Sequence, residues 1–222
     1  MEALYIVSTP LGSLEDITLR ALRILKEVDI IAAEDTRHTK KLLTHYDIHK
    51  PLVSFFEGNE MKRLDGLIGE IKSGKNVALV SDAGTPAISD PGFKFVRAAI
   101  SEGIEVIPVP GPSAAITALS ASGLPTDQFT FVGFLPDKEG KRKTKLGELK
   151  DYNHTLVFYV SKWKIEKVLA DMLEIFGDRP AAMCREMTKV YEEIKRGNIS
   201  KILESVKGKE IKGEITLVVG GA

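Results

Sequence analysis

The sequence of 222 residues has very little cysteine or tryptophan, with one residue of each, Cys184 and Trp163. A single cysteine excludes an intramolecular disulfide and every zinc site built on several cysteines, and it is typical of a reducing compartment. Cys184 is most simply a small buried apolar side chain. The histidines His45, His49 and His154 are scattered without the spacing of metal ligands, so we predict no metal site.

Net charge and long apolar runs are also absent. The chain has 31 Lys and Arg against 31 Asp and Glu, so no overall field attracts it to nucleic acid or to an anionic membrane. Any contact with a polyanion must therefore come from local patches. No window of about 18 apolar residues is present, and residues 1–7 carry no basic stretch before their apolar residues. We expect a soluble, cytoplasmic protein with no membrane partner.

Two nucleotide-binding fingerprints are missing, namely G-x-G-x-x-G and G-x-x-x-x-G-K-[ST]. Two other loops rich in glycine and proline are present instead, at 82–92 and 110–113, and each follows an apolar run that reads as a buried strand. In open α/β sheets, ligands bind at loops that leave the carboxyl ends of strands. The second loop also opens a helix, whose free N–H groups favour a carboxylate or phosphate. Together the loops predict half of a ligand pocket.

Short apolar runs and segments of helical period alternate along the first half of the chain. This pattern is typical of a mainly parallel sheet covered by helices. The predicted strands are 3–8, 28–33, 52–55, 76–81 and 104–109, and the predicted helices start near Asp16 or cover 39–45, 60–72, 91–102 and 113–122. Gly and Pro at 123–127 interrupt the alternation and mark the predicted boundary between domains 1–124 and 125–222.

The second half has a different pattern. The predicted strands are 129–134, 155–160, 181–186, 190–195 and 215–219, and the predicted helix is 165–176. Two of these strands, 181–186 and 190–195, are close enough in sequence to form a hairpin, which predicts a mixed sheet. We therefore expect a two-domain α/β protein with a mainly parallel N-terminal sheet and a mixed C-terminal sheet.

Polar side chains are dense at 34–39, directly after the second predicted strand. One interpretation is a solvated helix start, with Asp35 or Thr36 as the cap and Arg37 in a salt bridge. The other is substrate binding or proton transfer, because chemistry in such folds gathers at the carboxyl ends of strands. The residues alone leave both interpretations open.

Two further segments could contact RNA. The run 138–145 carries five basic residues against one acid, which fits either a solvated, mobile loop or a contact with phosphates. Lys162, Trp163 and Lys164 place an indole between ammonium groups, a combination that can stack a base, although a half-buried packing tryptophan is an equal alternative.

Several motifs closely resemble the ribosomal RNA methyltransferases of the tetrapyrrole methylase superfamily. The segments are 4–22, 32–43, 80–92, 108–129, 133–136, 185–189 and 212–219. The resemblance implies a class III methyltransferase that uses S-adenosylmethionine, with the cofactor in the cleft between two α/β domains. It also implies a homodimer that methylates the 2′-hydroxyl of a cytidine in the decoding region of small-subunit (16S) rRNA, free or in the 30S particle.

The resemblance also implies site residues. The cofactor residues it implies are Thr9, Pro10, Gly84, Thr85, Pro86, Ile88, Ser113 and Ala114, joined from the second domain by Tyr159, Arg185 and Thr216. We expect Glu34 or Asp35 to accept a proton and Arg37 to hold a neighbouring phosphate. The expected RNA contacts are Lys141, Arg142, Lys143, Lys162 and Trp163.

The chain departs from the superfamily pattern at 159–164, where relatives typically read Y-E-S-P-H-R. Two alternatives therefore accompany the rRNA prediction. One is a methyltransferase of the same fold that acts on a small molecule. The other is a non-catalytic relative that binds S-adenosylmethionine or RNA without turnover.

Overall fold

The computed structural model describes residues 2–222, and the chain divides into two compact units after Ser113. The elements of the first unit are β1 (Ala3–Val7), the short 3₁₀ helix η1 (Leu14–Asp16), α1 (Leu19–Glu27), β2 (Ile30–Ala33), α2 (Thr36–His45), β3 (Leu52–Ser54), α3 (Glu60–Lys72), β4 (Val77–Val80), α4 (Phe93–Ser101) and β5 (Glu105–Val109). Every strand of this unit and every helix from 60 to 101 lies close to its predicted range.

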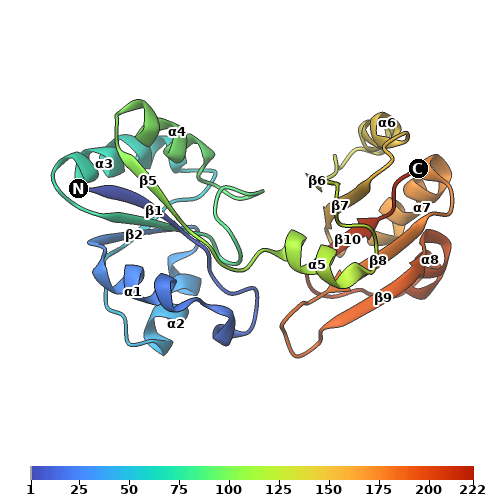
Figure 1. The fold of residues 1–222 in the computed structure, drawn as a ribbon, viewed down its shortest axis with the longest axis horizontal. Coiled ribbons are helices and arrows are strands. Elements are labelled where there is room, and N and C mark those ends of the chain that lie inside the picture. The colour runs from blue at the N-terminus through green and yellow to red at the C-terminus, as the bar shows by residue number, and fades with distance from the viewer. Residues whose placement is uncertain (1) are drawn as a thin grey trace. The chain divides into compact units, whose positions relative to one another are not determined.

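The five strands of the first unit form one sheet in the order β3-β2-β4-β1-β5, and every pair is parallel. Successive side chains of a strand point to opposite faces, and α1 and α2 cover one face while α3 and α4 cover the other (Figure 1). In β4, for example, Ala78 and Val80 pack under α1 and α2, and Val77 and Leu79 pack under α3 and α4. The parallel direction brings the carboxyl ends of β2, β4, β1 and β5 to one edge.

The first helix begins later than predicted. Asp16 lies in η1, and the N-cap of α1 is Thr18, whose hydroxyl accepts a hydrogen bond from Ala21 N at 3.0 Å. Both residue types cap helices well. Thr18 is the cap because Ile17 is buried in the core beneath α1, which fixes where the helix can start.

The second unit contains one helix packed on one face of a sheet and three helices on the other. Its elements are α5 (Ala114–Ser122), β6 (Phe129–Phe134), α6 (Glu139–Leu149), β7 (Thr155–Val160), α7 (Ile165–Phe176), β8 (Pro180–Arg185), β9 (Glu193–Asn198), α8 (Ile199–Val206) and β10 (Ile215–Val219). The order is β6-β7-β10-β8-β9, with β6 and β7 parallel and the other pairs antiparallel. The prediction of a mixed sheet is confirmed.

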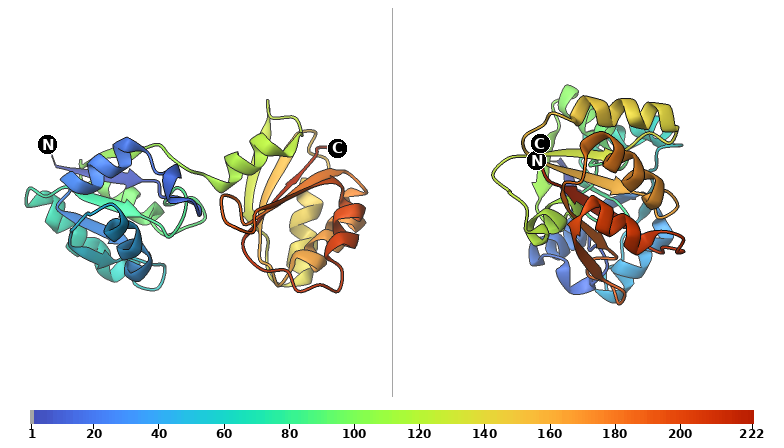
Figure 2. Two further views of the ribbon diagram at one scale, coloured as in Figure 1. Left: turned by 90° about the horizontal axis from the view of Figure 1, so that it is seen from below. Right: turned by 90° about the vertical axis from the view of Figure 1, so that its right-hand side faces the viewer.

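Helix α5 belongs to the second unit, although the sequence pattern grouped it with the first. Its small residues Ala115 and Ala118, with Leu119, pack on Val157 and Val218 of the second sheet. Figure 2 shows this helix on the face opposite to α6, α7 and α8. Turn residues at 123–127 connect α5 to β6, so they lie inside the unit rather than between units.

Two helices of the second unit were not expected from the sequence. Helix α6 begins at Glu139, with Lys138 as its N-cap, and contains the rest of the basic run 138–145 that we expected to be a loop or an RNA contact. Helix α8 follows β9 directly at Asn198. The helical period of α6 is weak because Leu146 and Leu149 are its only buried apolar residues. In α8 the apolar residues Ile199, Ile202 and Val206 do have helical spacing, but the helix is only eight residues long. Within residues 2–222, no helix has the length and apolar character needed to cross a bilayer.

Candidate functional site

The loops that follow β1 and β4 are joined by backbone hydrogen bonds. Thr9 N donates to Gly84 O at 2.9 Å, and Gly84 N donates to Thr9 O at 3.0 Å. The Thr9 hydroxyl donates to Ser81 O at 3.1 Å, and Thr9 is buried. Since both donors of Thr9 are used within the protein, this residue shapes the loop rather than offering a hydrogen bond to a ligand.

The loop after β5 is tied to the same place through Thr85. Its hydroxyl donates to Pro112 O at 3.1 Å, so the Ser8 hydroxyl, 3.0 Å away, is the donor in the bond between Ser8 and Thr85. Gly111 passes so close that an added Cβ would lie 2.8 Å from Ser8 Cβ. The three loops that follow β1, β4 and β5 therefore form one braced group.

The loop 84–92 has an unusual backbone. Gly84 and Gly92 have φ of 80° and 134°, and the non-glycine residues Ala87 and Ser89 have φ of 68° and 62°. Left-handed conformations cost non-glycine residues about 1–3 kcal/mol and are concentrated at binding and catalytic sites. Ile88, between the two strained residues, is 46% exposed and offers an apolar surface at this edge.

A second hydrogen-bonded group joins the ends of β2 and β4. Asp82 Oδ1 accepts from Asp35 N at 3.0 Å, and Glu34 Oε2 accepts from Asp82 N at 3.4 Å. Three carboxylates thus lie at two neighbouring strand ends. Burial raises the pKa of Glu34, the N–H of Asp82 opposes that rise, and the charges of Asp82 and Asp35 add to it.

Asp35 is the N-cap of α2. Its carboxylate accepts from Arg37 N at 2.8 Å and pairs with the Arg37 guanidinium at 2.7 Å. The Arg37 hydrogen bonds hold the pKa of Asp35 well below its usual range. The first interpretation of 34–39, with Asp35 as cap and Arg37 in a salt bridge, is what the structure contains. A carboxylate held in this way is a poor proton acceptor, whereas Glu34 has the raised pKa expected of one.

In the second unit, Tyr159 and Thr216 lie side by side. They are directly paired across β7 and β10, and Thr216 is paired in turn with Cys184 on β8. All three lie on the face covered by α5, because their neighbours Val157, Ala182 and Val218 pack against that helix. Ala114, the first residue of α5, packs against the same cluster.

Arg185 does not join this row. It is paired with Ile215, which lies on the opposite face of the sheet in the core under α7 and α8. Its guanidinium binds Glu193 at 3.1 Å and Lys212 O at 3.2 Å. The structure therefore separates Arg185 from Tyr159 and Thr216, with which the sequence grouped it.

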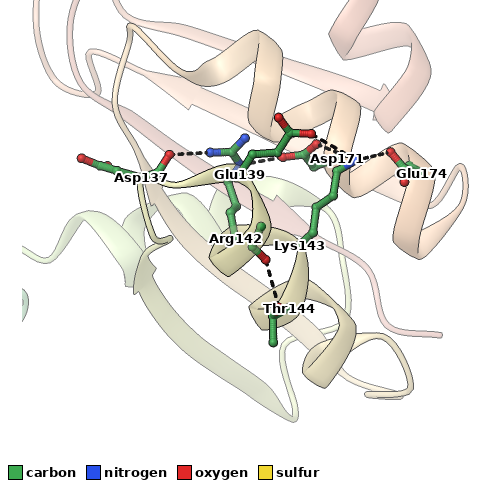
Figure 3. Close-up of polar contacts among 8 residues, drawn as sticks. Asp137, Glu139, Arg142, Lys143, Thr144, Asp171 and Glu174 are labelled. Carbon is green, nitrogen blue, oxygen red and sulfur yellow. Dashed lines mark hydrogen bonds and ion pairs between the residues drawn. The ribbon is translucent and has the colours of Figure 1, made fainter.

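The basic run contains a buried ion pair instead of a row of free cations. Arg142 is 4% exposed, and its Nε donates to Asp171 on α7 at 2.6 Å (Figure 3). Lys143 reaches Glu174 at 2.7 Å, and Figure 3 shows both contacts on the side of α6 that faces α7. Arg142 therefore cannot contact RNA from this position, and Lys143 is already neutralised. Lys141 is exposed and stays a prediction.

Exposed aromatic residues lie at the carboxyl ends of the parallel strands β6 and β7. Phe134 is 61% exposed and packs edge-on against Tyr159, with ring centroids 5.6 Å apart. Trp163 is 71% exposed, and Lys162 Nζ lies 4.8 Å from its ring centroid. Of the two alternatives for Trp163, the half-buried packing role does not fit this exposure.

The site offers loop backbone, hydroxyls and carboxylates, but no cluster of side chains suited to a metal ion among residues 2–222. A Cβ added at Gly84 would make ordinary van der Waals contacts with Leu11 at 3.4 Å and Pro112 O at 3.8 Å. Glycine is favoured there because the loop turns with a φ of 80° at this residue. The braced loops and the carboxylates of 34–35 and 82 are thus suited to binding a polar organic cofactor beside an acceptor group.

A family model described as Tetrapyrrole (Corrin/Porphyrin) Methylases matches residues 3–203 of the sequence. The chain belongs to this family. It is 53% identical over 218 residues to the ribosomal RNA small subunit methyltransferase I of Halalkalibacterium halodurans, covering 98% of this chain and 75% of that protein. It is 49% identical over 221 residues to the protein of the same name from Thermotoga maritima, covering 100% of this chain and 99% of that protein.

The fold is also that of solved tetrapyrrole methylases. The uroporphyrin-III C-methyltransferase of Thermus thermophilus, crystallised with S-adenosylhomocysteine, superposes with a TM-score of 0.67 over 98% of this chain and 97% of its own. The two sequences are 19% identical, so this similarity establishes the fold alone. The family resemblance and the predicted two-domain α/β fold are confirmed.

Sequence reasoning missed three residues that build the site. Asp82 connects the ends of β2 and β4, and Ser8 and Pro112 complete the bracing around Thr85. A signal for Asp82 was available, because it is an acid directly after a buried strand, like Glu34. No signal in the sequence marks Ser8 or the carbonyl of Pro112, since their role depends on which loops become neighbours.

Proposed function

We propose that this protein transfers a methyl group from S-adenosylmethionine to small-subunit ribosomal RNA. The observation that carries the proposal is the identity of 53% and 49%, over nearly the whole chain, with two proteins named ribosomal RNA small subunit methyltransferase I. The braced loops at the carboxyl edge of the first sheet support it, because this is where such sheets bind ligands.

S-adenosylmethionine supplies a methyl group on a positively charged sulfur, which is already a strong electrophile. The protein must therefore mainly position the acceptor and exclude water, effects that can supply several kcal/mol. In the proposal, the loops around Gly84, Thr85 and Pro86 bind the cofactor, with Ile88 as an apolar wall. Thr9 and Ser8 hold these loops, and Pro10, Ser113, Ala114, Tyr159 and Thr216 complete the proposed contacts.

We further propose that the acceptor is the 2′-hydroxyl of a cytidine. Glu34 would take the proton, because its pKa is raised and its carboxylate is held beside Asp82. Arg37, whose side chain is 88% exposed, would contact a neighbouring phosphate. Asp35, as the cap of α2, would hold Glu34 and Arg37 in position. Trp163 with Lys162 would stack a base, and Lys141 would contact a phosphate.

The substrate, as free rRNA or as the 30S particle, would place the protein in the cytoplasm, and we propose that it acts there as a homodimer. Sedimentation of the purified protein tests the dimer directly. Methylation of isolated rRNA and of 30S particles at equal concentration tests which form of the RNA is the substrate.

The deciding experiment uses radiolabelled S-adenosylmethionine with the purified protein and 30S particles that lack the modification. We expect label in the RNA, and mass mapping of its nucleosides to place the methyl group on a cytidine ribose. The control is the same protein with tetrapyrrole and other small acceptors. Label only in a small acceptor would contradict the RNA assignment, and cofactor binding with no transfer to any acceptor would favour a non-catalytic protein.

A further inference from the structure

Helix α2 and the loop that follows it carry a concentration of positive charge. Residues 37–50 contain Arg37, Lys40, Lys41 and Lys50 but one acid, Asp47. Three of the four histidines of the chain also lie in this stretch. With a net charge of zero for the whole molecule, such a local excess is where a polyanion would be attracted.

The cations of this stretch are arranged as a stripe along the helix. Thr39, Leu42 and Leu43 are buried against the sheet, and Arg37, Lys40, Lys41 and Thr44 are exposed. Spacings of three and four residues put these four on one face. The ten residues of the helix extend about 15 Å, from the polar group at Asp35 to the far edge of the sheet.

The three lysines are free to bind an external anion. Among the ion pairs formed by residues 2–222, Arg37 is paired with Asp35 and His49 with Asp47, but no carboxylate is paired with Lys40, Lys41 or Lys50. The run 138–145 differs in this respect, because Arg142, Lys143 and Lys145 are each paired with a carboxylate. From the number of basic residues in the sequence alone, the run 138–145 was the predicted RNA contact.

A groove lies at the far end of the stripe. It has a volume of about 440 Å³ and is lined by Lys40, Thr44, His49 and Lys50 together with the apolar side chains of Leu43 and Ile48. Leu43 and Ile48 are almost fully buried, so the floor of the groove is part of the core and is fixed. Two unpaired ammonium groups above an apolar floor suit a phosphate attached to a sugar, since each part meets a surface of matching polarity.

We infer that the α2 stripe, defined as Lys40, Lys41, Lys50 and the groove beside them, binds the sugar-phosphate backbone of the RNA substrate away from the methylated nucleotide. This inference rests on the proposed function, because it takes RNA as the substrate. Arg37 at the start of the helix would contact the backbone near the acceptor, and the stripe would guide the strand from there to the groove. The contact is electrostatic and does not select a base.

The test measures how RNA binding depends on salt. Each phosphate contact on a single strand contributes about 0.7 to the slope of log K against log salt. The variant Lys40→Gln/Lys41→Gln/Lys50→Gln is therefore expected to lower the slope by about 2, with affinity for S-adenosylmethionine unchanged by calorimetry. The matched control is Lys26→Gln/Lys62→Gln/Lys207→Gln, which removes three exposed positive charges from other elements and should leave the slope near that of the parent.

A second variant tests the groove without changing charge. Thr44→Phe fills it from an exposed position and should weaken RNA binding several-fold while cofactor binding stays the same. If the parent protein binds and methylates rRNA but the triple lysine variant and its control have equal slopes, the stripe is not an RNA contact. If the parent protein neither binds nor methylates rRNA, the proposed function is wrong and this inference falls with it.

Discussion

Asp82 accepts a hydrogen bond from the backbone N–H of Asp35 at 3.0 Å, and this contact fixes the end of β2 against the end of β4. The Asp82 N–H in turn faces the Glu34 carboxylate. Two adjacent acids on one strand end are thereby given different environments. Asp35 is bound to Arg37, which lowers its pKa, whereas Glu34 is half-buried beside the negative charges of Asp82 and Asp35 and has a raised pKa. Environments that separate the pKa values of paired acids mark their separate roles.

Substitutions at Asp35 should separate a cap from a proton acceptor. Asparagine also caps helices well, so Asp35→Asn should keep the structure and a methylation rate within about threefold of the parent. Loss of a general base would instead cost about 10²–10⁴ in rate. Asp35→Ala removes the cap and should lower the free energy of unfolding by about 1 kcal/mol, measured by urea denaturation. A large loss of rate in Asp35→Asn with unchanged stability would assign the proton to Asp35.

Glu34→Gln should lower the methylation rate by about 100-fold or more, because the amide cannot accept the proton. The pH dependence provides the sharper test. Glu34 must be ionised to act, and its raised pKa means that the rate of the parent falls with decreasing pH at values above those of an ordinary glutamate. This acidic limb of kcat/KM should be absent in Glu34→Gln. An acidic limb that persists in the variant belongs to another group.

Regular elements were predictable where one physical signal dominated. The strands at 129–134, 155–160 and 215–219 were assigned correctly because runs of apolar residues flanked by turns specify buried strands. The assignment of α5 was wrong in its partner but correct in its type, since an alanine-rich helix can pack on either neighbouring sheet. The pattern of apolar residues within the helix does not determine which of the two sheets it packs on.

Charge in the sequence was a weaker guide. Five basic residues at 138–145 predicted a surface for phosphates, but Asp171 and Glu174, the acidic partners of Arg142 and Lys143, come from a helix about thirty residues later in the chain. The lysines of the α2 stripe are fewer, and within residues 2–222 no carboxylate is paired with Lys40, Lys41 or Lys50. Whether a cation is available depends on tertiary pairing, which no pattern of adjacent residues reveals.

The pair of Arg142 and Asp171 should matter for stability rather than for RNA binding. Both side chains are less than a tenth exposed, and removing Arg142 leaves the buried Asp171 carboxylate with only the more distant Lys143, 3.8 Å away. Arg142→Ala should therefore lower the free energy of unfolding by about 3–5 kcal/mol, measured by urea denaturation. The double variant Arg142→Met/Asp171→Leu removes both charges and should recover most of that loss. Equal stability of the single and double variants would show that lost packing, and not the unpaired charge, is the cause.

The ionisation of Cys184 should make the free energy of unfolding decrease as pH rises. Burial raises the pKa of its thiol to about 11, above the value in an unfolded chain. Between the two values the folded state keeps its proton and the unfolded state loses it, so stability falls as pH rises. The difference in unfolding free energy between the parent and Cys184→Ala should therefore shrink from pH 8 to pH 11. The thiol should also react slowly with an alkylating reagent in the native protein at pH 8. A pH-independent difference would show that the thiol ionises alike in both states.

Thr85 should control cofactor binding through its hydroxyl rather than through its size. The hydroxyl donates to Pro112 O and accepts from Ser8, so it connects the loops after β4, β5 and β1. Thr85→Val keeps the volume but leaves the Pro112 carbonyl without its donor, a loss of about 1–3 kcal/mol. If the loops bind S-adenosylmethionine, this corresponds to an increase in Kd of about 5-fold to 150-fold by calorimetry. Thr85→Ser retains the hydroxyl and should bind almost as the parent does. Equal affinities for the serine and valine variants would mean that the cofactor does not depend on the bracing of these loops.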